Sequence, residues 1–244
     1  MRNQKHQNCY NCGTKLIGKY CSNCSQKSDT KRLDFKHFMQ HDIIHGALHF
    51  DKGLLYTVKE IMLRPGKVTN DYISGKRVRY YNFFYLSLLI IGFTLLLQSL
   101  HQEKITLTGK SVTYIETRNF ASKNIKYILL SFIPFFALSS RIVYRKVHYN
   151  IAEHTIIASV TLIYFLVLNL LSEVVDLTGL QMHHNAIFSS LSGLLIVYIY
   201  YQTFKQHYTT KKWGNALNAF LTLVLFSFLF LLLMFIIIYI LTTK

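Results

Sequence analysis

Residues 64–81 read RPGKVTNDYISGKRVRYY, and this stretch separates two chemically different parts of the chain. The residues before it are polar and basic and contain all four cysteines, whereas long hydrophobic runs follow it. Pro65 and Gly66 predict the end of a helix, because proline lacks an N–H donor and disfavours the helical conformation of Arg64. Gly75 predicts a tight reversal before the first apolar run. We interpret residues 64–82, called the junction below, as the boundary between a cytosolic segment and a bundle of membrane helices.

The composition combines 51% hydrophobic residues with a net charge of +16, which is unusual for a soluble globular protein. The apolar residues are concentrated in long runs, as is typical of membrane proteins. The polar N-terminus gives no indication of a signal peptide, and no internal repeat is evident. The predicted fold class is an all-α integral membrane bundle of about five transmembrane helices, with a small N-terminal zinc ribbon and amphipathic interfacial helices. The corresponding domains are the ribbon at 1–30, the interfacial helices and basic junction at 31–82, and the bundle at 83–244.

The four cysteines form two C-x-x-C pairs, Cys9 with Cys12 and Cys21 with Cys24. Two thiolates at this spacing can turn toward one ion, and two such pairs complete a closed tetrahedral zinc site. Two disulfides or reactive thiols are the alternative. A segment of about 20 residues with so few apolar side chains does not fold on burial alone. The pattern therefore predicts a structural zinc ion with no open position for a substrate.

Four histidines recur every four residues ahead of the junction, so that on a helix they would lie along one face. A second metal site or a haem site is one interpretation, because histidines at i and i+4 can share an ion. A pH-sensitive surface patch is another. The preferred interpretation is the polar stripe of a helix lying on the membrane surface, followed by a second helical run over residues 54–63. The histidines are His37, His41, His45 and His49.

Three cations, Lys76, Arg77 and Arg79, stand immediately before the first apolar run. Each would contribute about 1 kcal/mol to binding an anionic leaflet, so we expect them to contact lipid headgroups. A phosphate-bearing ligand or a nucleic acid is the alternative partner. Nucleic acid is disfavoured, because the aromatic residues follow helix faces instead of forming a stacking platform.

Together, three motifs resemble those of an uncharacterised bacterial family of membrane proteins. The motifs are Y-C-x-x-C ending at Cys24, D-K-G-x-x-x-T-x-K-E at 51–60, and R-P-G-x-x-x-x-x-Y-I-x-G-K-R-x-x-Y at 64–80. The resemblance covers about residues 8–100 and reaches the later helices only by hydropathy. In that family a proline often follows the last motif, and this chain lacks it. The resemblance implies a bacterial inner-membrane location and a domain of unknown function, with no established activity.

The distribution of lysine and arginine predicts a cytoplasmic N-terminus. The loops at 144–151 and 205–216 are basic, whereas the loop at 172–185 contains neither residue type. Alternating polarity predicts a β-hairpin at 102–117 on the outer face. The predicted transmembrane helices are 83–100, 127–143, 152–171, 186–204 and 217–241.

Glu153 and His154, at the start of the third run, form a candidate intramembrane polar site that could relay protons or bind a cation. The alternative is a carboxylate that the helix dipole favours at a helix start. No catalytic motif with a nucleophile and a base is present, so no catalytic residue is assigned and an enzyme is disfavoured.

The favoured function is a membrane-anchored protein-binding or regulatory module. Residues 1–82 contain 15 basic and 6 acidic residues, a net charge of +9, which favours anionic partners. The expected partners are the anionic bilayer surface and a cytosolic protein, and a homo-oligomer remains open. The alternative is a transporter or permease component for a small solute, ion or lipid, with a regulatory ribbon. Five unequal helices without an inverted repeat count against that alternative.

Overall fold

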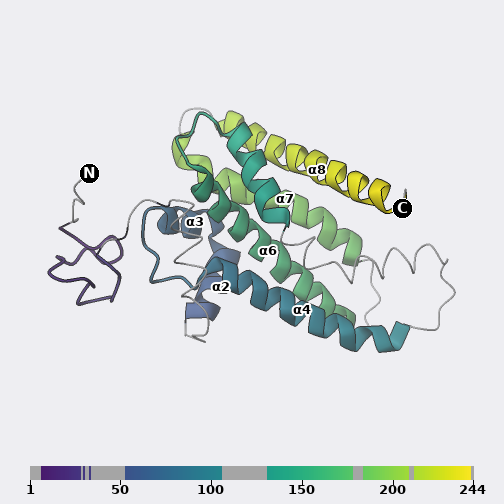
Figure 1. Cartoon of the computed structure of the whole chain (residues 1–244), viewed down its shortest axis with the longest axis horizontal. Helices are drawn as coiled ribbons and strands as arrows, with labels where there is room; N and C mark the ends of the chain where they lie inside the picture. The colour runs from purple at the N-terminus through teal and green to yellow at the C-terminus, as the bar shows by residue number, and fades with distance from the viewer. Residues whose placement is uncertain are drawn as a thin grey trace.

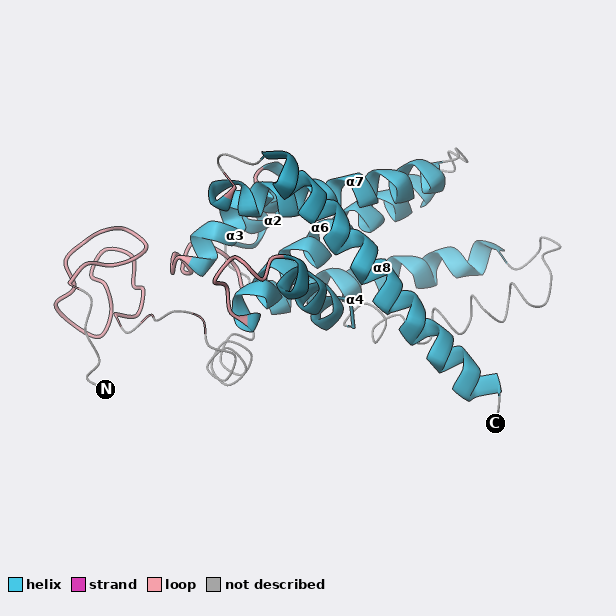
Figure 2. Ribbon diagram, turned by 90° about the horizontal axis from the view of Figure 1, so that it is seen from above, coloured by secondary structure: helices cyan, strands magenta, loops and turns pink. Residues whose placement is uncertain are grey.

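The structure is a computed structural model that describes residues 7–28, 30, 33, 53–105, 131–177, 184–208 and 212–242. Residues 7–28, which contain the four cysteines, are called the cysteine segment below. Apart from this segment and the short connections, the described residues are helical. Figure 1 shows the cysteine segment beside one end of a helical bundle, and Figure 2 shows that this segment is built from loops. The elements are α2 (Gly53–Leu63), α3 (Pro65–Ile73), α4 (Phe83–Ile105), a helix over Ser131–Val143, α6 (Ile151–Leu177), α7 (His184–Phe204), the 3-10 turn η2 (Lys205–His207) and α8 (Lys212–Thr242).

Each of the five predicted hydrophobic runs falls in a helix wherever the structure describes it. The predicted hairpin at 102–117 is wrong at its start, because residues 102–105 continue α4. Gln102, Glu103 and Lys104 have high helix propensity, so the helix extends past the apolar run. The rest of that hairpin lies outside the described residues, as do the four histidines spaced four apart.

Two helices are long and apolar enough to cross a membrane, in the ranges Ile151–Ser172 and Lys212–Ile236. The helices at Phe83–Leu97 and Ser131–Val143 are apolar but shorter. In α8 only 17% of the apolar window is buried within the protein, compared with 61% in α6. Five crossings therefore remain a prediction, and α8 leaves most of its hydrophobic surface without protein cover.

The core is arranged around α6, which lies between α4 and α7 (Figure 1). Ile156 and Ile163 are fully buried on this helix. The helix over Ser131–Val143 joins α7 and α8 through aromatic stacking: the rings of Phe136 and Phe226 are parallel, with centroids 3.6 Å apart. Both rings are buried, so the pair adds apolar burial to the contact between the two helices.

The junction's first helix, α3, is inserted into the bundle. Val68 and Thr69 are fully buried, and the Asn70 amide donates to the backbone carbonyl of Thr203 on α7 at 3.1 Å. At Gly66 an added Cβ would stand 2.7 Å from backbone and side-chain atoms of Gln202, so only glycine permits this approach of α3 to α7.

The two basic connections, residues 144–150 before α6 and residues 205–208 after α7, lie close together at the end of the bundle that carries α3. The Tyr149 hydroxyl lies 3.5 Å from Asn70 Oδ1 and 3.2 Å from His207 Nε2. The connection after Val143 and the connection after α7 are thus held together beside the junction. Both connections contain lysine or arginine.

Candidate metal centre

The four cysteine sulfurs converge on one point. All four Sγ atoms lie within 4.8 Å of one another, with 3.5 Å between Cys9 and Cys24 and 3.4 Å between Cys12 and Cys21. A disulfide would require about 2.05 Å, and the cysteines are free thiols. Four sulfurs at about 2.3 Å from a tetrahedral ion would stand about 3.8 Å apart, close to the spacing found here. The four cysteines could therefore hold a metal ion.

Each C-x-x-C pair is positioned by a backbone turn. In the first, the Cys9 N–H donates to the Thr14 carbonyl at 2.8 Å and the Gly13 N–H donates to the Cys9 carbonyl at 2.9 Å. Gly13 has a φ of +76°, a left-handed conformation that glycine adopts without steric cost. The turn directs the Cys9 and Cys12 side chains to the same side.

The second turn repeats the first twelve residues later. The Cys21 N–H donates to the Gln26 carbonyl at 2.8 Å, and the Ser25 N–H donates to the Cys21 carbonyl at 2.9 Å. Ser25 occupies the position in this turn that Gly13 occupies in the first, and it also has a positive φ, of +59°. Isolated bridges at Asn8–Lys15 and Tyr20–Lys27 extend the correspondence. Sequence reasoning missed this repeat, although the pattern C-x-N-C occurs twice, at 9–12 and at 21–24, twelve residues apart.

The thiols differ in their ease of ionisation. A hydrogen bond with the Thr14 hydroxyl, at 3.3 Å, lowers the pKa of Cys12 to about 6, whereas burial raises the pKa of Cys9 to about 11. Metal binding requires thiolates, so an ion entering this site displaces the protons of the cysteines that are still thiols.

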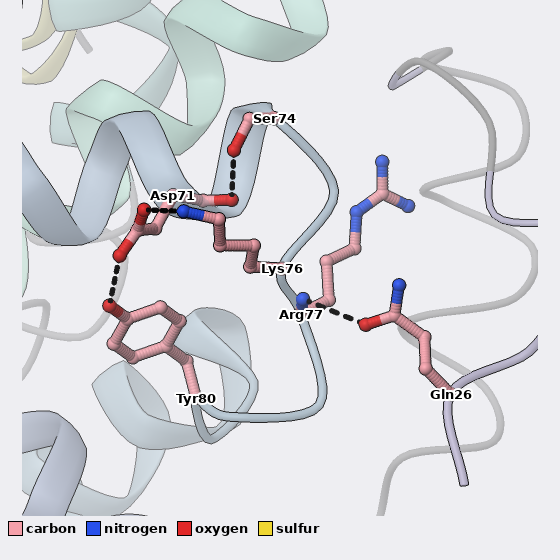
Figure 3. Close-up of polar contacts among 6 residues, drawn as sticks. All are labelled: Gln26, Asp71, Ser74, Lys76, Arg77 and Tyr80. Carbon is pink, nitrogen blue, oxygen red and sulfur yellow. Dashed lines mark hydrogen bonds and ion pairs between the residues drawn. The ribbon is translucent and has the colours of Figure 1, made fainter. Parts of the chain in front are cut away.

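Gln26 connects this segment to the junction. Gln26 is 2% exposed, and its Nε2 donates to the Gly75 carbonyl at 2.8 Å. Its Oε1 accepts the Arg77 backbone N–H at 3.3 Å, as Figure 3 shows. Gly75 has a φ of +100°, and an added Cβ would lie 3.3 Å from the Tyr10 side chain. The turn after α3 therefore receives residues from both C-x-x-C turns. Sequence reasoning missed Gln26, because nothing local distinguishes it from a surface glutamine.

Asp71 organises the same turn from the bundle side (Figure 3). Its carboxylate accepts Lys76 Nζ at 2.7 Å and the Tyr80 hydroxyl at 3.1 Å, and its backbone carbonyl accepts the Ser74 hydroxyl at 2.8 Å. Burial and the neighbouring Asp71 carboxylate raise the pKa of Tyr80. The loop is thus fixed by charge-assisted bonds within the protein.

The three junction cations have different surroundings. Lys76 is half-buried and paired with Asp71, and the Arg77 guanidinium lies 5.8 Å from the centroid of the Tyr72 ring. Arg79 is exposed. Of the three, Arg79 is the most exposed, so it is the best placed to contact headgroups.

Glu153 and His154 lie apart from the thiols, at the start of α6. Glu153 and Asn150 form a reciprocal cap: the Asn150 N–H donates to the Glu153 carboxylate at 2.8 Å, and the Glu153 N–H donates to Asn150 Oδ1 at 2.9 Å. His154 Nδ1 lies 2.8 Å from the Ser140 hydroxyl, and the ring borders a hollow of about 380 Å³ that Arg141 also lines. The carboxylate thus has the helix-start role described above as the alternative.

Residues 51–93 match a family described as a protein of unknown function, DUF3667. The match covers α2, α3, the Gly75 turn and the first part of α4, and it includes the second and third sequence motifs. The resemblance to a family of unknown function is confirmed over these residues. No curated protein and no solved structure matches the chain.

Proposed function

We propose that the chain is an integral protein of the bacterial inner membrane that presents a structural zinc ribbon to the cytoplasm as a binding module for a cytosolic protein. The observation that carries this proposal is the ribbon's two-sided character. Gln26 and Tyr10 contact the junction, whereas Ile17 is 94% exposed and Tyr20 is 57% exposed.

The choice of zinc follows from the donor set and from the lack of a core. Four thiolates with tetrahedral spacing and no open position suit a structural zinc ion. Among residues 7–28 the buried side chains are those of Cys9, Cys21 and Gln26. Burial of so little apolar surface cannot offset the entropy of ordering this segment, so metal binding would supply the folding free energy.

The membrane location is supported by the surface of α8. Phe228, Leu231 and Phe235 are each more than 60% exposed on this helix, and an apolar surface of this size requires a cover other than water. The basic connections and the ribbon share one end of the bundle, which supports a cytoplasmic placement of that end.

The partner's chemistry follows from the exposed ribbon surface. Three lysines in the same segment as Ile17 and Tyr20 are also exposed, namely Lys15, Lys19 and Lys27. Residues 7–28 contain no acidic side chain. We therefore infer a protein segment that offers an apolar side chain flanked by carboxylates. Electrostatic complementarity would raise its association rate and make binding sensitive to salt.

The test is site-specific photo-crosslinking in cells with the full-length protein. A crosslinking amino acid in place of Ile17 should give an adduct with an acidic cytosolic protein, and the adduct should disappear when Cys24→Ser is added. Leu55, 77% exposed on α2, is the matched control position and should not give that adduct. The same adduct from both positions, or an adduct that persists in Cys24→Ser, would contradict the proposal.

A further inference from the structure

A hollow of about 490 Å³ lies where α3 meets the end of α7 and the start of α8, a size typical of small-ligand sites. Three lysines line it: Lys67 from α3, Lys205 from η2 and Lys212 from α8. The amides of Asn70 and Gln202 also border it, and none of the described lining residues is acidic. We propose that this hollow binds the phosphate group of an anionic phospholipid.

The lysines converge because of the tertiary fold. The contact of Gly66 with Gln202 places the α3 start against α7, and the bond from Asn70 to the Thr203 carbonyl fixes it there. No ion pair to these lysines occurs among the described residues. Three ammonium groups around one hollow repel each other, and an anion between them removes that repulsion.

Two helix starts reinforce the preference for an anion. α3 begins at Pro65, and its N-cap residue Arg64 makes no side-chain capping bond. Gly66, in the first turn of α3, lines the hollow, and α8 begins with Lys212, which also lines it. The positive end of a helix dipole at such positions favours negative charge, and here it adds to three lysines.

The adjoining surface of α8 favours a lipid over a soluble phosphate. Directly after Lys212, Trp213 is 90% exposed, Leu217 is 58% exposed and Phe220 is 53% exposed. An exposed tryptophan at the start of an apolar helix is typical of the membrane interface. A headgroup held by the lysines would have its acyl chains along this surface. The inference takes from the proposed function only the membrane location of the helices.

The test measures lipid retention by the full-length protein. Native mass spectrometry in detergent, with added phosphatidylglycerol or phosphatidylcholine, should show preferential retention of one phosphatidylglycerol. The double variant Lys205→Gln, Lys212→Gln should lose about thirtyfold in affinity for it. The control variant Lys59→Gln, Lys146→Gln removes the same charge from exposed positions outside the hollow and should retain the lipid.

Competition identifies the source of the phosphate. Soluble glycerol phosphate at millimolar concentration should not displace the lipid; displacement would overturn the assignment to a phospholipid. Equal losses in the two double variants would also overturn it, because they would show only general attraction between charges. The proposed function is tested separately by the adduct from Ile17 and by sedimentation of the protein with membranes. A membrane-bound protein with that adduct but no lipid preference would refute this inference alone.

Discussion

Replacing Gln26 by alanine should detach the ribbon from the junction without disturbing the thiols. The side chain is 2% exposed and makes two hydrogen bonds to the junction backbone, at 2.8 Å to the Gly75 carbonyl and at 3.3 Å from the Arg77 N–H. Removing it deletes two hydrogen bonds, while the Arg77 N–H keeps its bond to the Gly75 carbonyl at 3.0 Å. At about 0.5–1.5 kcal/mol for each lost bond, the substitution should cost about 1–3 kcal/mol of docking free energy. The bond that shapes the second turn, from the Cys21 N–H, uses Gln26's backbone carbonyl and is retained in the variant.

A loss of about 2 kcal/mol corresponds to an undocked population about thirtyfold larger. Amide hydrogen exchange at Arg77 should therefore accelerate by as much as thirtyfold, because exchange follows the population of the open state, in which the Arg77 N–H retains only its bond to the Gly75 carbonyl within the turn. Exchange in α6 and the metal content of the protein should be unchanged. The control is Ser22→Ala, at an exposed position in the same turn.

Two results would refute this reasoning. If Arg77 exchanges at the same rate in Gln26→Ala and Ser22→Ala, the contact contributes nothing to docking. If exchange accelerates equally in α6, the substitution acts on global stability and Gln26 is no local connector. Loss of the metal in Gln26→Ala would likewise show that the side chain serves the thiol site.

Cys24→Ser should lower bound zinc from one equivalent per chain to almost none by elemental analysis while the helical circular dichroism persists, because the bundle packs without the ribbon. Gly66→Ala should lower the free energy of unfolding by roughly 1–3 kcal/mol, because its methyl group would lie 2.7 Å from Gln202 on α7. The control is Gly92→Ala on α4, where an added methyl group has no atom within 4 Å, and it should not lower this free energy. Thermal melts of the two variants make the comparison. Tyr80→Phe should reduce the loss of stability at alkaline pH. The raised pKa of Tyr80 keeps this side chain protonated in the folded state, whereas tyrosine in the unfolded chain ionises above about pH 10, so the free energy of unfolding falls as the pH rises above about 10. Denaturant titrations at several pH values should show a smaller fall in the variant.

The docked ribbon gives the matched family region a structural meaning. Within residues 51–93 the Gly75 turn contacts Gln26, and α3 contacts α7 through Asn70. Asp71 holds this turn through Lys76 and Tyr80. A short set of hydrogen bonds therefore connects residues 7–28 to the helices, and the Gln26 variant tests whether this connection contributes to stability.

Sequence reasoning placed the elements well where the determinants are local. The C-x-x-C spacing predicted one site for four thiols, and the long apolar runs predicted the helices, because both depend on neighbours a few residues apart. The hairpin at 102–117 was wrong where it is described, since alternation of polarity over a short window does not exclude a helix made of good helix formers. Glu153 was weighed as a site and as a helix start, and the cap with Asn150 supports the helix start.

The sequence alone determined the cluster of four thiols, the helical character of the apolar runs and the basic character of the loops at 144–151 and 205–216, because each depends on residues that are close in the chain. Only the tertiary structure decided what those parts contact. Gln26 contacts Gly75 across 49 residues of chain, and Lys67, Lys205 and Lys212 line one hollow because α3 packs on α7 at Gly66. Contacts of this kind depend on how buried surfaces pack over long separations, and no local pattern records that packing.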